Sequence, residues 1–487
     1  MVPSMKTRKP AGKMERHWLG WERPLLHATV DFLLEKYAVL SDWDMDQVIC
    51  VFPSSMASRR LAELLAERAQ RKSLVLRPPT IMTIGQLPEQ LYQARFPFAS
   101  EYEQLLGWTK ILRAAPADFL KPLLIEIPPA AQVAPWVELA GLLASLHREL
   151  SSDLTLFADV AQRLKGESEL ADEAVRWQVL AKLQRDYLDE LHRAGRWDIQ
   201  TARRYAIDKQ EPRTDRDIVV VGAVDLNRAQ RQFLQAVEER VTVLIGAPKS
   251  WRDGFDEFGT LKGYFWEHLP VELRDEQLVP RATANESADE VARQLAYLGS
   301  KYTAQEITIG VPDPNLIPLI QERLERVGIR GRSGAGTMAS QTSPIRLLKA
   351  IVEYLNENNY ESLAALVRFP AVYDLLVGRD GLPENFLESV DRYYQQTLIG
   401  QLGLGEFPQA AGVEVFQRLF ERVNEWLRPL RQPAMELKSW AKPFQEVLAA
   451  CYQTTIADLD SEQGDKLADA CRQLGQAIAQ LGDLPTN

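Results

Sequence analysis

Cysteine is scarce in this chain of 487 residues, which has only Cys50, Cys451 and Cys471. They stand far apart, and no CxxC or cysteine–histidine spacing joins them, so neither a disulfide framework nor a zinc or iron–sulfur site is supported. The five histidines form no HExxH pair, and no GxSxG segment occurs. The residues for metallohydrolase or serine-hydrolase chemistry are therefore lacking. The cysteine content also favours a reducing compartment.

Long apolar runs and an excess of basic residues are lacking too. No uninterrupted apolar run reaches the roughly 18–20 residues of a membrane span, and the first 17 residues contain no apolar segment typical of a secretory signal. We therefore expect a cytoplasmic protein without a membrane partner. Fifty-seven basic against 67 acidic residues give a formal net charge of −10. Any contact with nucleic acid must then come from local patches.

The remaining composition is that of a folded globular protein. Hydrophobic residues make up 46% and charged residues 25% of the chain, which excludes disordered and collagen-like classes. At roughly 100–200 residues per domain, this length predicts two to four domains.

Short β-branched runs alternate with helical spacing in the first half. Strands are predicted at 48–52, 80–84, 218–222 and 241–246, with helices at 57–70 and 230–239 between them. Uninterrupted apolar strands that flank a helix predict a parallel sheet covered on both faces. Residues 87–205 show a period of 3.6 instead, which predicts a helical insertion.

A second α/β unit is predicted near residue 286. A helix at 288–302, a strand at 307–311 and a helix at 316–327 that ends at Gly328 make up this pattern. Beyond Pro344 nearly everything is predicted to be helical.

Motifs that carry chemistry are weak. The segment 331–338 approaches a phosphate-binding loop but has Thr337 and Met338 in the Lys and Ser/Thr slots, so a flexible loop is favoured. Asp42, Asp44 and Asp46 begin like a calcium loop, yet the required Gly and Glu are missing, and a solvated loop before the strand is the better interpretation. Glu436-Leu437-Lys438 matches half of a nuclease motif, which chance alone supplies in a chain this long. We expect no bound metal or cofactor.

The order of the segments, rather than any one motif, resembles a known family. Residues 51–55 with Arg59-Arg60-Leu61, followed by 79–87, resemble the early core of the AddB and RecB-like helicase–nuclease family, a PD-(D/E)XK nuclease family. Residues 218–230 are similar to its Walker B region, and 363–370 to a helical insertion of its second motor core. The resemblance implies an α/β fold of two RecA-like, P-loop NTPase-like parallel-sheet cores with large α-helical insertions. The implied parts are 1–87 and 211–275 for core 1, 88–210 for its insertion, 276–350 for part of core 2, and 351–487 for a second insertion.

Departures from the family pattern bear on activity. Gly222 and Ala223 occupy the acidic Walker B slots, although Asp225 and Gln230 persist, and residues 18–26 stand where an active motor has its phosphate loop. Without a lysine for phosphate and an acidic pair for Mg²⁺, phosphoryl transfer has no electrostatic support. The chain also stops before motor motifs V and VI and the nuclease domain. We therefore expect no catalytic residues and an inactivated helicase.

The resulting hypothesis is a non-catalytic scaffold for repair or recombination of DNA double-strand breaks. Its expected partners are DNA, single-stranded or as a tailed duplex, and an AddA-like helicase–nuclease subunit. The candidate DNA-binding residues follow or end core strands or lie in the glycine-rich loop: Arg59, Arg60, Thr83, Arg330 and Arg332. Two alternatives stay open: a protein-interaction scaffold without DNA binding, and the N-terminal fragment of a longer ATP-dependent nuclease subunit. A residual NTPase would need residues that the aligned segments lack.

Overall fold

The computed structural model forms two compact units, Met1–Ser287 and Ala288–Asn487. The residues that it describes are 14–165, 168–299, 301–303, 306–331, 333–334, 336, 339–378, 381–403, 407–433, 436–457 and 462–482.

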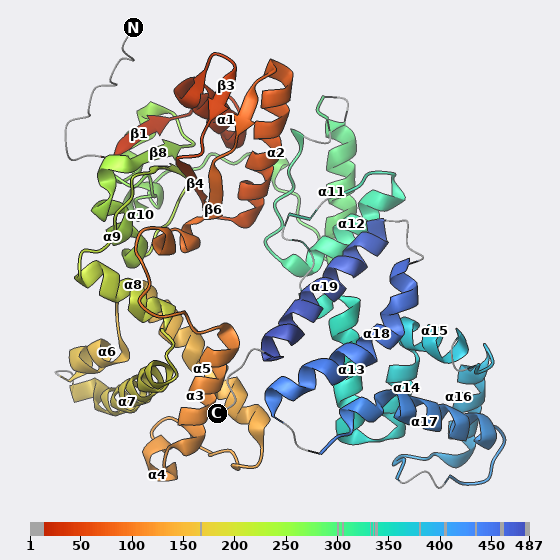
Figure 1. The fold of residues 1–487 in the computed structure, drawn as a ribbon. Helices are drawn as coiled ribbons and strands as arrows, with labels where there is room; N and C mark the ends of the chain where they lie inside the picture. The colour runs from red at the N-terminus through yellow and green to blue at the C-terminus, as the bar shows by residue number, and fades with distance from the viewer. Residues whose placement is uncertain are drawn as a thin grey trace. The chain divides into compact units, whose positions relative to one another are not determined.

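The first unit is built on a five-stranded sheet in which every pair of neighbouring strands is parallel (Figure 1). Its strands, in spatial order, are β1 (Glu15–Trp18), β8 (Val241–Ile245), β7 (Asp217–Val221), β4 (Val48–Phe52) and β6 (Thr80–Thr83). All five residues of β4 and of β8 are buried, as the apolar character of every one except Thr242 predicts. The predicted parallel sheet is confirmed, and β1 is a strand that the sequence patterns did not indicate.

Alternate side chains of these strands enter two separate hydrophobic clusters. Cys50 and Phe52 pack with α1 (Leu25–Tyr37) and α2 (Ser55–Lys72) on one face. Ile49 and Val51 pack with α9 (Arg228–Ala236) and part of α8 (Ile199–Asp208) on the other. The sheet is therefore covered on both faces.

A small second sheet lies beside α1 and was missed by sequence analysis. It consists of β2 (Ala38–Val39), β3 (Asp42–Asp44) and β5 (Val75–Arg77), in the order β2-β3-β5. The solvated loop expected for the aspartates at 42–46 is thus wrong for 42–44. The physical reason is the burial of Trp43 and Met45 in the cluster of α1 and α2, which fixes β3 in an extended conformation.

The predicted helical insertion is present between β6 and β7. It contains α3 (Glu101–Ala114), α4 (Ala117–Leu120), α5 (Val133–Ser152), α6 (Phe157–Leu164), α7 (Ala171–Arg193) and α8. Its core gathers Trp108, Trp136, Phe157 and Tyr187, and the rings of Trp108 and Tyr187 stack with centroids 4.2 Å apart. Trp136 is 3% exposed.

A buried polar network joins three helices of the insertion. Nε2 of His147 lies 3.2 Å from Oδ1 of Asp198, while the amide of Gln184 donates to Nδ1 of His147 over 2.8 Å, which places the ring proton on Nε2. Tyr187 donates its hydroxyl to Asp198, and Thr201 donates both its N–H and its hydroxyl. His147 and Asp198 are 2% and 1% exposed. Asp198 thereby caps α8 and fastens it to α5 and α7.

Ser151 brings the residue types of a hydrolase triad together, because its hydroxyl lies 3.2 Å from Nδ1 of His147. All three side chains are buried, and Gln184 already donates to the same ring nitrogen. No substrate can reach this hydroxyl in the folded chain. The arrangement has a structural role and holds α5, α7 and α8 together.

The pKa of Asp198 lies below its usual range. Burial alone would raise it, but the hydrogen bonds from His147 and Thr201 outweigh burial. Because the folded-state pKa is below the unfolded value of about 3.9, the carboxylate's contribution to stability is complete above that pH and is lost as the pH falls through the folded-state pKa.

The only regular elements among the described residues of the second unit are helices (Figure 1). From the boundary onward the helices are α11 (Ala284–Leu298), α12 (Ile317–Arg326), α13 (Ser343–Glu357), α14 (Tyr360–Val367), α15 (Pro370–Gly378), α16 (Phe386–Thr397), α17 (Val413–Leu427), α18 (Ala441–Ala457) and α19 (Glu462–Gly482). A cluster around Leu347, Tyr354, Phe386 and Phe416 forms the core of α13–α18. The prediction of helices beyond Pro344 is confirmed for these residues.

The strand predicted at 307–311 is wrong. These residues have no regular secondary structure, and Val311 instead packs with α11 and α12 around Ala288 and Ile320. A strand needs a neighbour to take its backbone hydrogen bonds, and the described residues of this unit supply no other strand.

Among the helices that the structure describes, none combines the length and apolar character needed to cross a membrane.

We expect Asp198→Ala to lower the free energy of unfolding by about 3 kcal/mol or more at neutral pH, because His147, Thr201 and Tyr187 lose a buried acceptor. The loss should shrink as the pH falls through the folded-state pKa. Urea titrations followed by circular dichroism at several pH values measure it.

The matched control is Asp186→Ala, which removes a carboxylate that forms a partly exposed i,i+4 pair with Lys182. It should cost about 1 kcal/mol or less. Equal effects of the two variants would contradict the role assigned to the buried network.

Candidate nucleic-acid interface

The candidate site lies at the edge of the large sheet where its strands end. After β4 the chain moves to β6, and after β7 it moves in the opposite direction to β8. Open α/β sheets bind ligands beside such a reversal, outside the carboxyl ends of the strands. The loops after Phe52 and Val221 define this place, which we call the carboxyl edge.

Arg59 lies close to this edge near the start of α2, whose N-cap Ser54 accepts a hydrogen bond from the N–H of Ala57. The Arg59 side chain is exposed, and no described residue accepts a hydrogen bond from it. Arg60 differs, because its guanidinium lies 2.7 Å from the carboxylate of Glu63 and 3.6 Å from that of Glu67. Of the two adjacent arginines, Arg59 is the one available to a ligand.

Thr83 ends β6 at the same edge, but its polar groups are engaged locally. Its N–H and hydroxyl donate to Oε1 of Gln86 over 3.0 and 3.2 Å, within the 3₁₀ helix η1 (Ile84–Gln86) and its cap. Arg203 of α8 donates to the carbonyl of Gly85 and forms a two-pronged ion pair with Glu89 at 2.6 and 2.7 Å. The helical insertion is thereby anchored to the segment after β6.

Three further cations at this edge were missed by sequence analysis. Arg228 is the first residue of α9, which follows β7, while Lys249 and Arg252 lie in the 3₁₀ helix η5 (Lys249–Gly254) after β8. All three are exposed. With Arg59 they form a set that we call the edge cations, supplied from beyond the ends of β4, β7 and β8. Their shared position after neighbouring strands is the signal that would have found them.

Carboxylates lie at the same edge. Asp225 is exposed in the loop after β7, and Asp253 lies 3.7 Å from the guanidinium of Arg252. The charge of the edge is therefore mixed, and Coulomb attraction for a polyanion depends on which cations a ligand reaches.

Leu25 fills the space where β7 and β8 end. A Cβ atom placed on Gly222 would lie 2.7 Å from Cδ2 of Leu25, and one placed on Gly246 would lie 3.3 Å from both of its methyl carbons. Gly222 also has a φ of +59°, which favours glycine. Upstream, the N–H of Leu19 and the indole N–H of Trp21 donate to carbonyls of β8 and its end. Leu19, Trp21 and Leu25 thus hold this segment against the ends of β7 and β8, while the side chains of residues 21–24 are exposed.

An aromatic stack borders the same end of β8. The ring centroids of Trp21 and Trp251 are 5.3 Å apart, and Trp251 stacks on Trp266 at 5.4 Å with 9° between the planes. Trp21 is 56% exposed, whereas Trp266 is fixed by a hydrogen bond from its indole N–H to the carbonyl of Gly254. These side chains form a supported aromatic surface that no spacing in the sequence indicates.

The remaining predicted residues lie in the second unit. Arg330 follows α12 and is exposed. Arg332 lies outside the described residues. Of the five predicted DNA-binding residues, the structure thus places Arg59 and Thr83 near one another at the carboxyl edge, with Arg60 beside Arg59 on α2.

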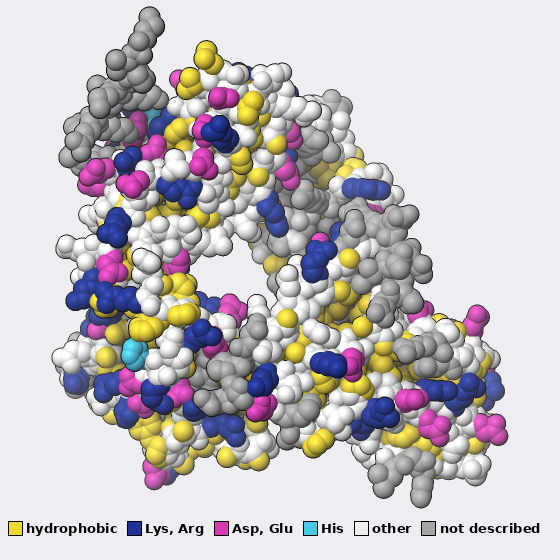
Figure 2. Space-filling view, in the orientation of Figure 1, with side chains coloured by type: hydrophobic (Ala, Val, Ile, Leu, Met, Phe, Trp, Pro, Cys, Tyr) yellow, Lys and Arg dark blue, Asp and Glu magenta, His cyan; other side chains and the backbone are white. Residues whose placement is uncertain are grey.

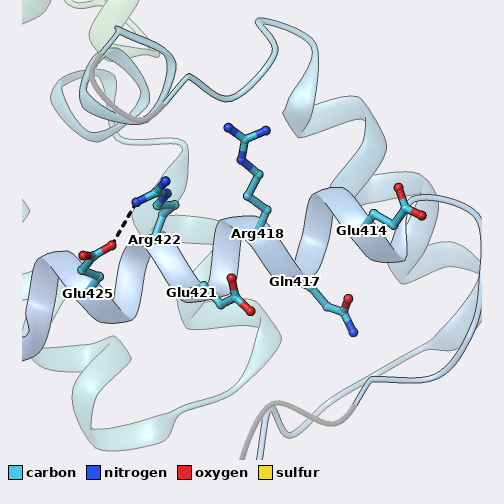
Figure 3. A pocket seen from close by; sticks show the side chains of 6 residues that line it. All are labelled: Glu414, Gln417, Arg418, Glu421, Arg422 and Glu425. Atoms are coloured by element: carbon cyan, nitrogen blue, oxygen red, sulfur yellow. Dashed lines mark hydrogen bonds and ion pairs between the residues drawn. The ribbon is translucent and has the colours of Figure 1, made fainter.

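An open polar cavity of about 400 Å³ lies along α17 (Figure 3). It is lined by Glu414, Gln417, Arg418, Glu421, Arg422 and Glu425. Arg422 pairs with Glu425 at 3.0 Å, and all six residues come from one helix face. Ligand pockets are mostly apolar with a few convergent polar groups, so this cavity has the character of a solvated helix face. In the described residues no cluster of three or more His, Cys, Asp and Glu side chains could hold a metal ion.

A scan against models of protein families finds no match to the chain, and a search of curated proteins finds none either.

We expect Gly222→Ala to be destabilising for two reasons, the positive φ and the contact with Leu25. The first costs about 1–2 kcal/mol and the second about 1–3 kcal/mol more. In a Leu25→Ala background the second contribution should vanish. Thermal and urea unfolding of the four proteins of this double-mutant cycle measure the coupling.

Gly195→Ala is the matched control, since Gly195 has a φ of +67° and nothing within 4 Å of an added Cβ. It should show the cost of the positive φ alone. If Gly222→Ala costs the same with and without Leu25, the close packing described here is incorrect.

Proposed function

We propose that this chain is a non-catalytic, AddB/RecB-like scaffold in DNA double-strand-break repair, which binds DNA at the carboxyl edge and is held by an active helicase–nuclease partner in the cytoplasm. One observation carries the proposal: three adjacent strands of a parallel sheet are each followed by exposed cations at the same edge. The helical insertion between β6 and β7 agrees with the resemblance to that family.

The edge cations suit phosphate contacts. The charged groups of Arg59, Arg228 and Lys249 form no ion pair among the described residues, although the backbone N–H of Arg228 donates to the carboxylate of Asp153 over 2.9 Å. Contacts of this kind give affinity and position along the strand but carry no sequence information. DNA of any sequence is the expected ligand.

The aromatic stack favours a single-stranded segment. Unpaired bases expose their faces and stack on aromatic side chains, whereas bases in a duplex are already stacked on one another. Trp21 offers such a face, and it contacts the tilted ring of Trp251, which itself stacks on Trp266. Lys249 and Arg252 closely flank Trp251 in the sequence. A duplex with a single-stranded tail would engage both features.

The Leu25 packing supports an inactivated motor. Charged phosphates need donors and cations around them, and an apolar side chain over Gly222 and Gly246 offers neither. The described residues of 276–350 contain helices but no strand, so the second RecA-like core stays an expectation of the resemblance.

The competing function is a protein-interaction scaffold without DNA binding. The formal net charge of −10 and the edge carboxylates Asp225 and Asp253 favour it. The chain as the N-terminal part of a longer nuclease subunit is compatible with either function. Direct binding measurements separate the two.

We expect the purified chain to bind a fluorescent duplex with a single-stranded tail, in the absence of nucleotide, with an affinity that falls steeply as salt is raised. The triple variant Arg59→Ala/Arg228→Ala/Lys249→Ala should bind more weakly and lower the salt slope by about 0.7–0.9 for each phosphate that is no longer neutralised. Fluorescence anisotropy across a salt series measures both quantities.

Arg418→Ala is the control, because Arg418 is an exposed arginine of α17 without a partner in the described residues. It should leave the slope unchanged. Absence of DNA binding by the parent chain at low salt would reject the DNA proposal for the isolated chain and favour the partner-held scaffold.

Trp21→Ala should reduce the preference for tailed over blunt duplex, since one stacked base contributes about 1–3 kcal/mol. The comparison uses both DNAs at one salt concentration, and Tyr297→Ala, at an exposed tyrosine of α11, is the control. An unchanged ratio of the two affinities would exclude stacking at this surface.

A further inference from the structure

The outward face of the small sheet carries three side chains in one row. The strand register places Val39 opposite Asp42 and Asp42 opposite Val75, so the row crosses β2, β3 and β5. The neighbouring row of Ala38, Trp43 and Leu76 points inward and packs with α1 and α2. We call Val39, Asp42 and Val75 the outer row.

The apolar members of this face are widely exposed. Val39 is 64% and Val75 61% exposed, and Leu40, in the turn beside the row, is 96% exposed. Leu40 also has a φ of +55°, a conformation that is unfavourable for a residue with a branched side chain and favours glycine in a two-residue hairpin turn. No contact within the described chain offsets either the exposure or the strain. Figure 2 shows hydrophobic and acidic side chains together at the surface over β3.

One carboxylate on this face has no cationic partner among the described residues. Asp42 stands between the two valines, and among the described residues its carboxylate has no ion pair or hydrogen bond. Its neighbour Asp44 differs, because Arg77 lies 2.7 Å away across the sheet. A cationic side chain of another molecule would form with Asp42 the kind of ion pair that Arg77 forms with Asp44.

The spacing of the row fits a helix that lies across the strands. Neighbouring strands are about 4.8 Å apart, so the row spans about 10 Å. Positions i, i+3 and i+7 of an α-helix lie on one face, with rises of about 4.5 and 10.5 Å from the first. The spacing of the three side chains in the row therefore matches the spacing of helix positions i, i+3 and i+7 closely.

We propose that the outer row is a docking surface for an amphipathic helix of a partner protein, with a Lys or Arg at i+3 and large apolar residues at i and i+7. The cation pairs with Asp42, the apolar residues cover Val39 and Val75, and Leu40 extends the apolar contact at one end. This surface lies on the small sheet and is independent of DNA binding at the carboxyl edge.

The test uses the full chain and a labelled alanine-based helical peptide of about 16 residues. The peptide has Leu at i and i+7 and Lys at i+3, and a second peptide has Glu at i+3. Fluorescence anisotropy should show binding of the Lys peptide, weakened at least about tenfold by Asp42→Lys, and this variant should bind the Glu peptide instead. Glu138→Lys, the same charge reversal on an exposed position of α5, should change neither affinity.

A second variant separates docking from folding. Leu40→Asn suits the positive φ better than leucine, so it should keep or raise the unfolding temperature while weakening the binding of the Lys peptide. The proposal is overturned if the Lys peptide does not bind, if both peptides bind the parent chain equally, or if Asp42→Lys leaves the preference unchanged.

Discussion

The first unit depends on one constraint, the need of an apolar parallel sheet to be covered on both faces. β4 and β8 are buried along their whole length, so each connection between strands must place a helix against one face or the other. The helices α1 and α2 cover one side, and α9 with part of α8 covers the other. Because all strands point the same way, the loops that begin these crossings gather at one edge. The candidate site is a consequence of that geometry.

The sequence predicted the strands that carry a strong local signal. Residues 48–52, 218–222 and 241–246 are β-branched, mostly apolar runs, and all three regions are central strands. β1 was missed because Glu15, Arg16 and His17 are polar and the strand pairs only with β8 at the sheet edge. The run at 307–311 has the same β-branched pattern yet forms no strand. A partner strand is non-local information, and local pattern does not contain it.

The site could be predicted only in part for a similar reason. Arg59 and Thr83 were placed at this edge because they follow or end recognised strands, but the polar groups of Thr83 are engaged by Gln86. Arg60 is next to Arg59 in the sequence and was predicted for the same role, but its guanidinium forms an ion pair with Glu63 at i+3. Arg228 and Lys249 belong with Arg59 only when β4, β7 and β8 are known to be adjacent. The packing of Leu25 against two glycines far away in the sequence has no local signature at all.

Helix α8 is held at two points that face different parts of the unit. Its first turn is capped by Asp198, which belongs to the buried network of the insertion, and Arg203, one turn further on, grips Glu89 and the carbonyl of Gly85 beside the sheet. A displacement of the insertion along α8 must therefore break two guanidinium–carboxylate bonds or carry residues 85–89 with it. Helix α8 therefore couples the insertion rigidly to residues 85–89, which directly follow β6. A force on the insertion is transmitted to the end of β6.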